Sequence, residues 1–239
     1  MSGESALREV LAKACQVLFA TRAAGDGLAG HLSARLDGER MLIKPRPASW
    51  RSVTPADLIV LDGNGNRVDG PASAESEVRE WPIHARIYRA RPDVACVMHA
   101  HPVASTLMGS LGIAVEPLDQ DCTLFVDQLS VLDNCAVSIS TPALGDAVAL
   151  ALGNARALLL QNHGSIVTGA SIAEVCVTAY RLEKVAETML RAASLARLPL
   201  VSPERKAALL AARKAAEPAR PESSHEERWK MLQDYYLPR

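Results

Sequence analysis

The amino-acid sequence predicts a three-layer α/β/α domain, with an α+β arrangement as the alternative, built from short strands that pair mostly through hairpins. Apolar residues recur at helical spacing over 5–21, and alternating runs joined by tight turns follow within 31–68. Helical and strand patterns then alternate over 80–195. The glycine-rich segment 25–30 has no G-x-G-x-x-G opening a helix, so a doubly wound dinucleotide-binding fold is not expected.

Local signals place the individual elements. Asp37-Gly38 is a hairpin turn, and Pro82 suits a first helical turn, where its missing N–H costs nothing. Ser171 and Glu174 form a capping box. The expected order is a helix over 5–21, strands at 31–36, 41–44, 57–61 and 67–68, a helix over 80–91, a strand at 94–101, a helix over 103–110, strands and a loop within 113–140, a helix over 144–152, strands at 157–161 and 165–167, and a helix from 171 to about 195.

From the length and composition we expect a single globular domain over residues 1–239, with a peripheral helical tail from about residue 202. Hydrophobic residues make up 49% and charged residues 22%, and the net charge of −1 provides no basic field for nucleic acid or membrane. No apolar run reaches the roughly 18 residues that span a bilayer. The N-terminal segment lacks a signal-peptide pattern, and the five cysteines are scattered with no C-x-x-C pair. We therefore expect a cytoplasmic protein with reduced, buried thiols.

The strand expected at 94–101 ends in His99-Ala100-His101. Alternate residues of a strand share a face, so the two histidine side chains project together, about 7 Å apart along the strand. Two imidazoles on one face suit a divalent metal such as Zn²⁺. The motif is short, and a purely structural role for both histidines is the alternative.

His163 and Glu80 are the candidates that would complete a metal site. His163 ends a buried apolar strand, and three imidazoles with an open fourth position are typical of a catalytic metal; the alternative is that His163 caps a turn. Glu80 would begin the helix over 80–91 and act as an acid/base, with a pKa raised by burial and lowered by a metal charge. The alternative is an exposed first-turn glutamate favoured by the helix dipole.

Five segments share their order and spacing with one protein family over roughly residues 5–195. They are Gly30–Arg35, Val53–Leu58, Glu80–His84 with Ile87–Asp93, Val97–Pro102 and Leu159–Gly164. In these segments the chain resembles the class II aldolase/adducin family, typified by L-fuculose-phosphate aldolase and L-ribulose-phosphate 4-epimerase.

The resemblance implies a central, mainly antiparallel sheet flanked by helices, and a homotetramer with active sites between neighbouring subunits. It also implies one divalent metal per subunit, held by His99, His101 and His163, with Glu80 as the catalytic acid/base. Zn²⁺ is the first expectation. Mn²⁺, Fe²⁺ or Co²⁺ also fit, because a carboxylate and an oxygen-chelating substrate can join the three imidazoles.

Departures from the family pattern point to the substrate. In the sugar-phosphate aldolases a pair of serines before the catalytic glutamate helps to hold phosphate, and Val78 and Arg79 stand there instead. His31 replaces an asparagine in the first glycine loop. Lys44-Pro45-Arg46-Pro47 replaces a small hydroxyl/glycine turn after the second strand. These changes disfavour a phosphorylated sugar.

The basic residues at these positions suit a carboxylate, because guanidinium pairs with it through two hydrogen bonds. The alternative is that Arg79, Arg46 and Lys44 are solvated surface charges. Ser33, and Tyr236 or its neighbour Tyr235, complete the candidate substrate-binding residues. The tyrosine is considered because in the aldolases a tail tyrosine reaches a neighbour's site.

The pattern is similar to the family's decarboxylase branch, whose members act on hydroxylated aromatic or pyridine carboxylates. The implied enzyme is a metal-dependent lyase that takes a small-molecule substrate. CO₂ would leave through a metal-stabilised enolate, with Glu80 protonating carbon and His31 as a second donor. One alternative is an aldolase or epimerase acting on an unphosphorylated or carboxylated sugar or hydroxy acid. Another, a non-catalytic adducin-like interaction domain, is less favoured because the histidines and the glutamate are retained.

Overall fold

The structure is a computed structural model that describes residues 3–71, 78–133, 135, 137–195, 201–216 and 223–237. Its helices are α1 (Gly3–Ala20), α2 (Trp81–Ala90), α3 (Val103–Ser110), α4 (Pro142–Leu152), α5 (Ile172–Ala193), α6 (Pro203–Ala216) and α7 (Ser223–Tyr236), with 3₁₀ turns η1 (Pro55–Asp57) and η2 (Cys122–Leu124). Its strands are β1 (His31–Arg35), β2 (Met41–Ile43), β3 (Ile59–Leu61), β4 (Arg67–Asp69), β5 (Cys96–Ala100), β6 (Leu129–Leu132), β7 (Ala157–Leu160) and β8 (Gly164–Gly169).

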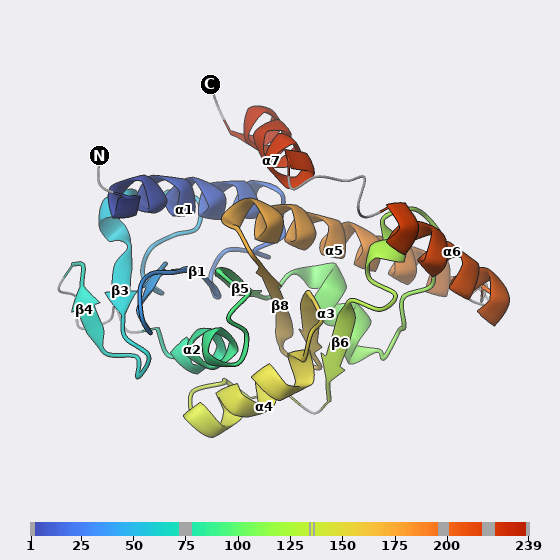
Figure 1. The fold of residues 1–239 in the computed structure, drawn as a ribbon, viewed down its shortest axis with the longest axis horizontal. Coiled ribbons are helices and arrows are strands. Elements are labelled where there is room, and N and C mark those ends of the chain that lie inside the picture. Colours follow the sequence, from blue (N-terminus) through green and yellow to red (C-terminus); the bar gives the residue numbers. More distant parts are fainter. Residues whose placement is uncertain are drawn as a thin grey trace.

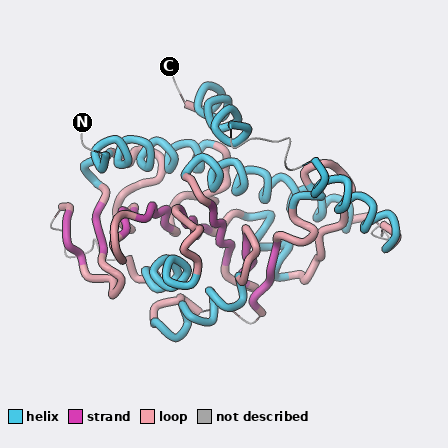
Figure 2. Tube along the Cα trace, in the orientation of Figure 1, coloured by secondary structure: helices cyan, strands magenta, loops and turns pink. Residues whose placement is uncertain are grey.

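The strands form one eight-stranded sheet in the order β4-β3-β2-β1-β5-β8-β7-β6. Every neighbouring pair is antiparallel except β6 and β7. Helices α1, α3 and α5 cover one face and α2 and α4 the other, so the predicted three-layer α/β/α architecture is confirmed (Figure 1). Figure 2 shows the strands running between the two helical layers, with α7 outside α1 and α5.

Alternation along β5 decides what faces each layer. Cys96, Met98 and Ala100 belong to the apolar core beneath α1 and α5, whereas Val97 packs in the core beneath α2 and α4. His99 therefore projects toward the α2 side, because side chains two apart share a face. The middle position of β5, between β1 and β8, places this histidine at the centre of the sheet.

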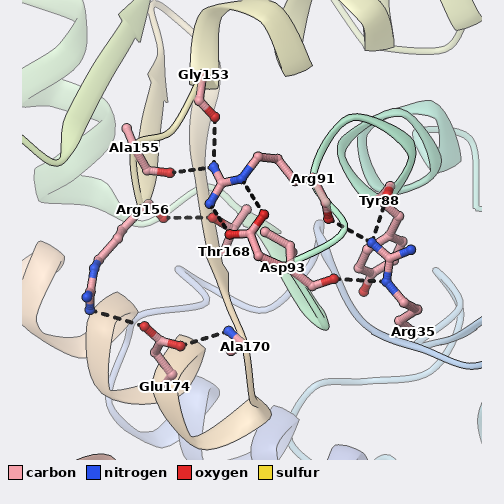
Figure 3. A network of polar contacts seen from close by, with 11 residues as sticks. Arg35, Tyr88, Arg91, Asp93, Gly153, Ala155, Arg156, Thr168, Ala170 and Glu174 are labelled. Carbon is pink, nitrogen blue, oxygen red and sulfur yellow. Dashed lines mark hydrogen bonds and ion pairs between the residues drawn. The ribbon is translucent and has the colours of Figure 1, made fainter.

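Two arginines lock the end of α2 against the sheet (Figure 3). Arg35 on β1 donates to the carbonyl oxygens of Tyr88 and Arg91 at 2.7 and 2.9 Å. Arg91 in turn donates to the Gly153 carbonyl at 2.7 Å and pairs with Asp93 at 2.6 Å. These bonds join β1, α2 and the α4–β7 connection, and so fix α2 relative to β5.

Two expectations differ from the structure. Residues 55–57 form η1 instead of starting a strand, because the Asp57 carboxylate accepts the Thr54 N–H at 2.8 Å and closes a turn. Within 113–140, β6 is the one strand among the described residues. A turn precedes it at η2, where Asp119 accepts the Cys122 N–H at 2.7 Å.

The cysteines and the helices bear on two further expectations. All five cysteines are buried and unpaired, as predicted. Among the described residues, the helices include none that is both long and apolar enough to cross a membrane.

Candidate metal centre

Three histidines meet at one end of the two central strands. His99 lies on β5, His101 follows that strand directly, and His163 lies in the turn that joins β7 to β8. Since β5 and β8 are antiparallel neighbours, with Ala100 opposite Ser165, the end of β5 lies beside the start of β8. The sheet order therefore joins a histidine far along the chain to the His-x-His motif.

The rings are arranged as three neighbours around one point. Their centroids are 5.0 Å apart for His99 and His101, 4.9 Å for His99 and His163, and 5.0 Å for His101 and His163. The Nε2 atoms of His99 and His101 are 3.2 Å apart. One candidate ligand atom from each ring and one from the Glu80 carboxylate all lie within 4.8 Å of one another.

Glu80 precedes α2 and is buried, so it is not the exposed first-turn glutamate that was the alternative. Its Oε2 lies 3.2 Å from His99 Nε2, and its Oε1 lies 3.5 Å from His163 Nε2. Oε1 also accepts hydrogen bonds from Ser138 Oγ at 3.0 Å and from the Ile139 N–H at 2.9 Å. These two donors hold one carboxylate oxygen in place beside the imidazoles.

The turn that carries His163 is tight. Asn162 adopts a left-handed backbone conformation with φ 62°, which asparagine tolerates better than most residues, and its N–H donates to Ser110 Oγ. The His163 N–H closes the turn on the Leu160 carbonyl at 3.0 Å. A Cβ at Gly164 would lie 2.5 Å from both the Ala100 carbonyl oxygen and His101 Cδ2. The glycine is what lets this turn approach His101.

Burial favours the neutral form of two of the three imidazoles, those of His101 and His163. Burial, with the neighbouring histidine charges, lowers the pKa of His101 to about 4, and burial with the charge of His99 also lowers the pKa of His163. For Glu80, burial alone would raise the pKa. The hydrogen bond and charge of His99, the Ile139 N–H and the charge of His163 outweigh that effect and hold the pKa below its ordinary range. An ionised Glu80 carboxylate beside the neutral rings of His101 and His163 results.

The donor set fits a divalent metal. His99 Nδ1 lies 3.1 Å from the Ser165 carbonyl oxygen, which can only accept, so Nδ1 carries the hydrogen and Nε2 presents its lone pair to the cluster. A hydrogen bond of this kind orients a metal-binding histidine. With two more imidazoles and one carboxylate, the arrangement could hold one cation and leave room for an oxygen ligand from a small molecule.

The two candidate residues on β1 lie beside this cluster. His31 stands directly opposite His99 in the β1–β5 pairing and is buried. Ser33 shares that face of β1. It is fully buried, and its hydroxyl is engaged inside the protein, 2.7 Å from His84 Nδ1 and 2.7 Å from the Tyr88 hydroxyl.

The remaining basic candidates are two exposed arginines and one buried lysine. Arg79, next to Glu80, and Arg46 are exposed. Lys44 Nζ donates to the Pro45 carbonyl and lies 5.2 Å from the Trp50 ring centre, in the core beneath α1 and α5 and so on the other face of the sheet from His99. Burial lowers the Lys44 pKa to about 8.

Tyr236 lies at the end of α7, with its ring centre 6.3 Å from that of Tyr180 on α5. This places Tyr236 on the outer side of α5, away from the cluster of its own chain. The expected role of this tyrosine concerns a neighbouring subunit's site, and within one chain it has no part in the centre.

Sequence reasoning assigned no role to four residues that support the centre. Ser138 and Ile139 hold Glu80, the Ser165 carbonyl orients His99, and His84 bonds Ser33. His84 alone had a signal, since it lies four residues after Glu80, on the same side of α2. Ile139 and Ser165 act through backbone groups, which leave no mark on residue type, and Ser138 acts through its hydroxyl.

The fold and the site together define an α/β protein with a candidate metal centre of three imidazoles and one carboxylate. The sequence profile of the Class II Aldolase and Adducin N-terminal domain matches residues 9–190, and the chain belongs to the class II aldolase/adducin family. The resemblance of the five segments is confirmed.

Relatives of known name include both decarboxylases and aldolases. A 3,4-dihydroxyphthalate decarboxylase of Terrabacter sp. (strain DBF63) is 30% identical over 201 residues, covering 80% of this chain and 83% of the relative. An L-fuculose phosphate aldolase of Escherichia coli O6:H1 is 30% identical over 187 residues, covering 77% and 83%. The crystal structure of an aldolase II superfamily protein from Pseudomonas syringae superposes with a TM-score of 0.86 at 23% identity, over 99% of this chain and 94% of that one.

Proposed function

We propose that this protein is a metal-dependent carbon–carbon lyase that decarboxylates a hydroxylated aromatic or pyridine carboxylate. The observation that carries the proposal is the convergence of His99, His101, His163 and Glu80, whose candidate ligand atoms lie within 4.8 Å of one another. A similar protein named as a 3,4-dihydroxyphthalate decarboxylase supports the choice of reaction.

The three histidines and Glu80 would hold the cation, with Zn²⁺ as the first candidate and Mn²⁺, Fe²⁺ or Co²⁺ as others. Bound there, a divalent cation supplies Lewis-acid stabilisation of negative charge on a substrate oxygen. Glu80 is the group that holds and moves the proton. Its Oε1 is anchored by Ser138 and Ile139, so Oε2 is the oxygen better placed to exchange a proton with substrate carbon. His31, opposite His99 on β1, is the second donor.

The surroundings of Glu80 favour an acid without phosphate. Val78 is buried in the apolar core beneath α2, so its position offers no hydroxyl to a phosphate. Arg79, exposed beside Glu80, and the exposed Arg46 can pair with a carboxylate. Lys44 is buried in the opposite core and would contribute by shaping the turn at Pro45. Ser33 would contribute through its hydrogen bond with His84.

An aldolase or epimerase acting on an unphosphorylated or carboxylated sugar or hydroxy acid is the second candidate. The observation in its favour is the equal similarity, 30% identity, to an L-fuculose phosphate aldolase. A non-catalytic adducin-like domain is the third, and the complete metal-ligand set argues against it.

We also propose that the chain forms a homotetramer with active sites between subunits, where Tyr235 or Tyr236 of one chain reaches the site of the next. Val103 and Leu107 on α3 and Leu111 directly after it are 75%, 45% and 61% exposed and lie four residues apart, so they form an apolar stripe that starts close to His101 in the chain. Light scattering on the purified protein should give four times the chain mass of 25.6 kDa. A monomer would contradict the assembly.

The reaction is tested by incubating metal-loaded protein with dihydroxyphthalates, hydroxybenzoates, hydroxypyridine carboxylates and a panel of phosphorylated and unphosphorylated aldols. We expect CO₂ release from a hydroxyaromatic acid, and release about 10²–10⁴-fold slower from the Glu80→Gln variant at equal metal content. Rapid aldol cleavage without CO₂ release selects the second candidate. If protein that carries one metal per chain acts on neither the carboxylic acids nor the aldols, both candidate reactions are contradicted.

A further inference from the structure

A chain of buried hydrogen bonds lies beside the candidate metal centre and has no place in the proposed reaction so far. The Tyr88 hydroxyl lies 2.7 Å from Ser33 Oγ, and Ser33 Oγ lies 2.7 Å from His84 Nδ1. All three side chains are buried, and Ser33 and His84 are fully so. Since buried polar groups are costly when unpaired, this chain has a preferred direction.

The direction follows from the tyrosine. Burial raises the pKa of Tyr88 well above its ordinary value, so the phenol stays protonated and keeps its own hydrogen to donate. Within the described residues, Ser33 Oγ is the one acceptor recorded for that hydrogen. Ser33 then has a single hydrogen to give, and His84 Nδ1 receives it. Reversing the chain would leave a buried phenol hydrogen unpaired, at a cost of about 1–3 kcal/mol.

The direction of these hydrogen bonds decides which nitrogen of His84 carries a hydrogen. With Nδ1 accepting, the neutral ring carries its hydrogen on Nε2. Among the residues that the structure describes, neither His84 Nε2 nor His31 Nδ1 has a hydrogen-bond partner, although both atoms are fully buried. The two rings are neighbours, with centroids 6.0 Å apart and planes at 80°. No direct hydrogen bond joins the two nitrogens among the described residues, and one bridging water can satisfy two buried polar atoms on neighbouring rings.

We propose that His84 is a positioning residue for His31: its Nε2–H is passed to His31 Nδ1 through one buried water, so that His31 carries its own hydrogen on Nε2. His31 stands opposite His99, and this tautomer makes its outer nitrogen a hydrogen-bond donor. The donor role of His31 rests on the proposed function, whereas the tautomers of His84 and His31 do not depend on turnover.

The test is nuclear magnetic resonance of ¹⁵N-histidine-labelled protein, metal-free and zinc-loaded, with long-range ¹H–¹⁵N correlations that distinguish the two neutral tautomers. We expect His84 and His31 to appear as single Nε2–H tautomers. Ser33→Ala removes the donor to His84, and both residues should lose the single-tautomer pattern. Tyr88→Phe keeps the shape of the ring and should also cause His84 to lose its single-tautomer pattern, before any change at His31. This variant replaces Ser33→Ala in the test if Ser33→Ala folds poorly.

Activity gives the second measurement. In the zinc-loaded Ser33→Ala and Tyr88→Phe proteins, kcat should fall about 10-fold with KM and zinc content little changed, a size typical of residues that orient another side chain. His225→Ala, a histidine on α7, is the matched control and should leave the His31 signals unchanged.

An Nδ1–H tautomer at wild-type His84 overturns the proposal, as do unchanged His31 signals in both variants. Expected tautomers in a protein that releases no CO₂ would instead reject the proposed function while leaving the hydrogen-bond chain intact.

Discussion

Glu80 Oε2 and His99 Nε2 lie 3.2 Å apart, although one residue precedes α2 and the other lies on the central strand of the sheet. The contact depends on α2 being fixed against β1 by Arg35, and on β5 presenting His99 to the α2 side. It joins a potential proton carrier to a potential metal ligand, and most of the chemistry proposed for this chain depends on it.

Removing one imidazole should weaken metal binding strongly. For His99→Ala we expect an affinity for Zn²⁺ at least about 100-fold weaker, because even the residues that only orient a ligand contribute 10- to 100-fold. Metal analysis after dialysis at fixed free zinc measures it. His225→Ala is the control, a histidine outside the cluster. Equal zinc content in wild type and His99→Ala would reject the centre.

Replacing the carboxylate should affect chemistry more than structure. In Glu80→Gln the amide oxygen can still accept from Ser138 and Ile139, so the fold should persist. We expect turnover to fall by about 10²–10⁴-fold, the usual contribution of a positioned acid/base. Steady-state rates at matched metal content measure it, with the exposed Glu39→Gln as control. A variant that retains full rate would exclude Glu80 as the proton carrier.

A methyl group at Gly164 should disturb the centre without touching a ligand. The new Cβ would lie 2.5 Å from the Ala100 carbonyl and from His101 Cδ2, so β5 or the His101 ring must move. We expect Gly164→Ala to weaken zinc binding and to lower the melting temperature. Gly3→Ala, where no atom lies within 4 Å, should do neither. Unaltered zinc affinity in Gly164→Ala would show that the turn does not position His101.

Acid should destabilise the metal-free protein. Burial lowers the pKa of His84 to about 3, below the 6.5 of an exposed histidine, so between these values the unfolded chain binds a proton that the native chain does not. The free energy of unfolding therefore falls as pH drops below 6.5, by about 3 kcal/mol for this residue at pH 4. Urea titrations from pH 7 to pH 4 measure the slope. His84→Asn should flatten it, and equal slopes in both proteins would contradict this account.

Much of the fold could be predicted because helical and strand periods are local. The strand that carries His99 and the N-cap of α5 follow from neighbours in the chain, and Ser171 Oγ does accept the Glu174 N–H at 3.1 Å. The second bond of the predicted capping box differs, because the Glu174 carboxylate accepts the Ala170 N–H instead of the Ser171 N–H. The failures were also local. Asp57, expected as the first residue of a strand, instead closes a 3₁₀ turn through a side-chain-to-backbone hydrogen bond. A similar bond at Asp119 forms a turn within 113–140, where strands and a loop were expected, and apolar content alone indicates neither.

The sequence by itself determined the layered fold, the family and the histidine set, because these depend on periodicity and on motifs whose spacing is visible along the chain. Tertiary structure decided the rest. It buried Glu80, moved Lys44 to the opposite face of the sheet, and used the Ser33 hydroxyl to orient His84. The physical reason is that burial and hydrogen-bond partners depend on which strands are neighbours in the sheet. The spacing of residues along the chain does not specify that strand order.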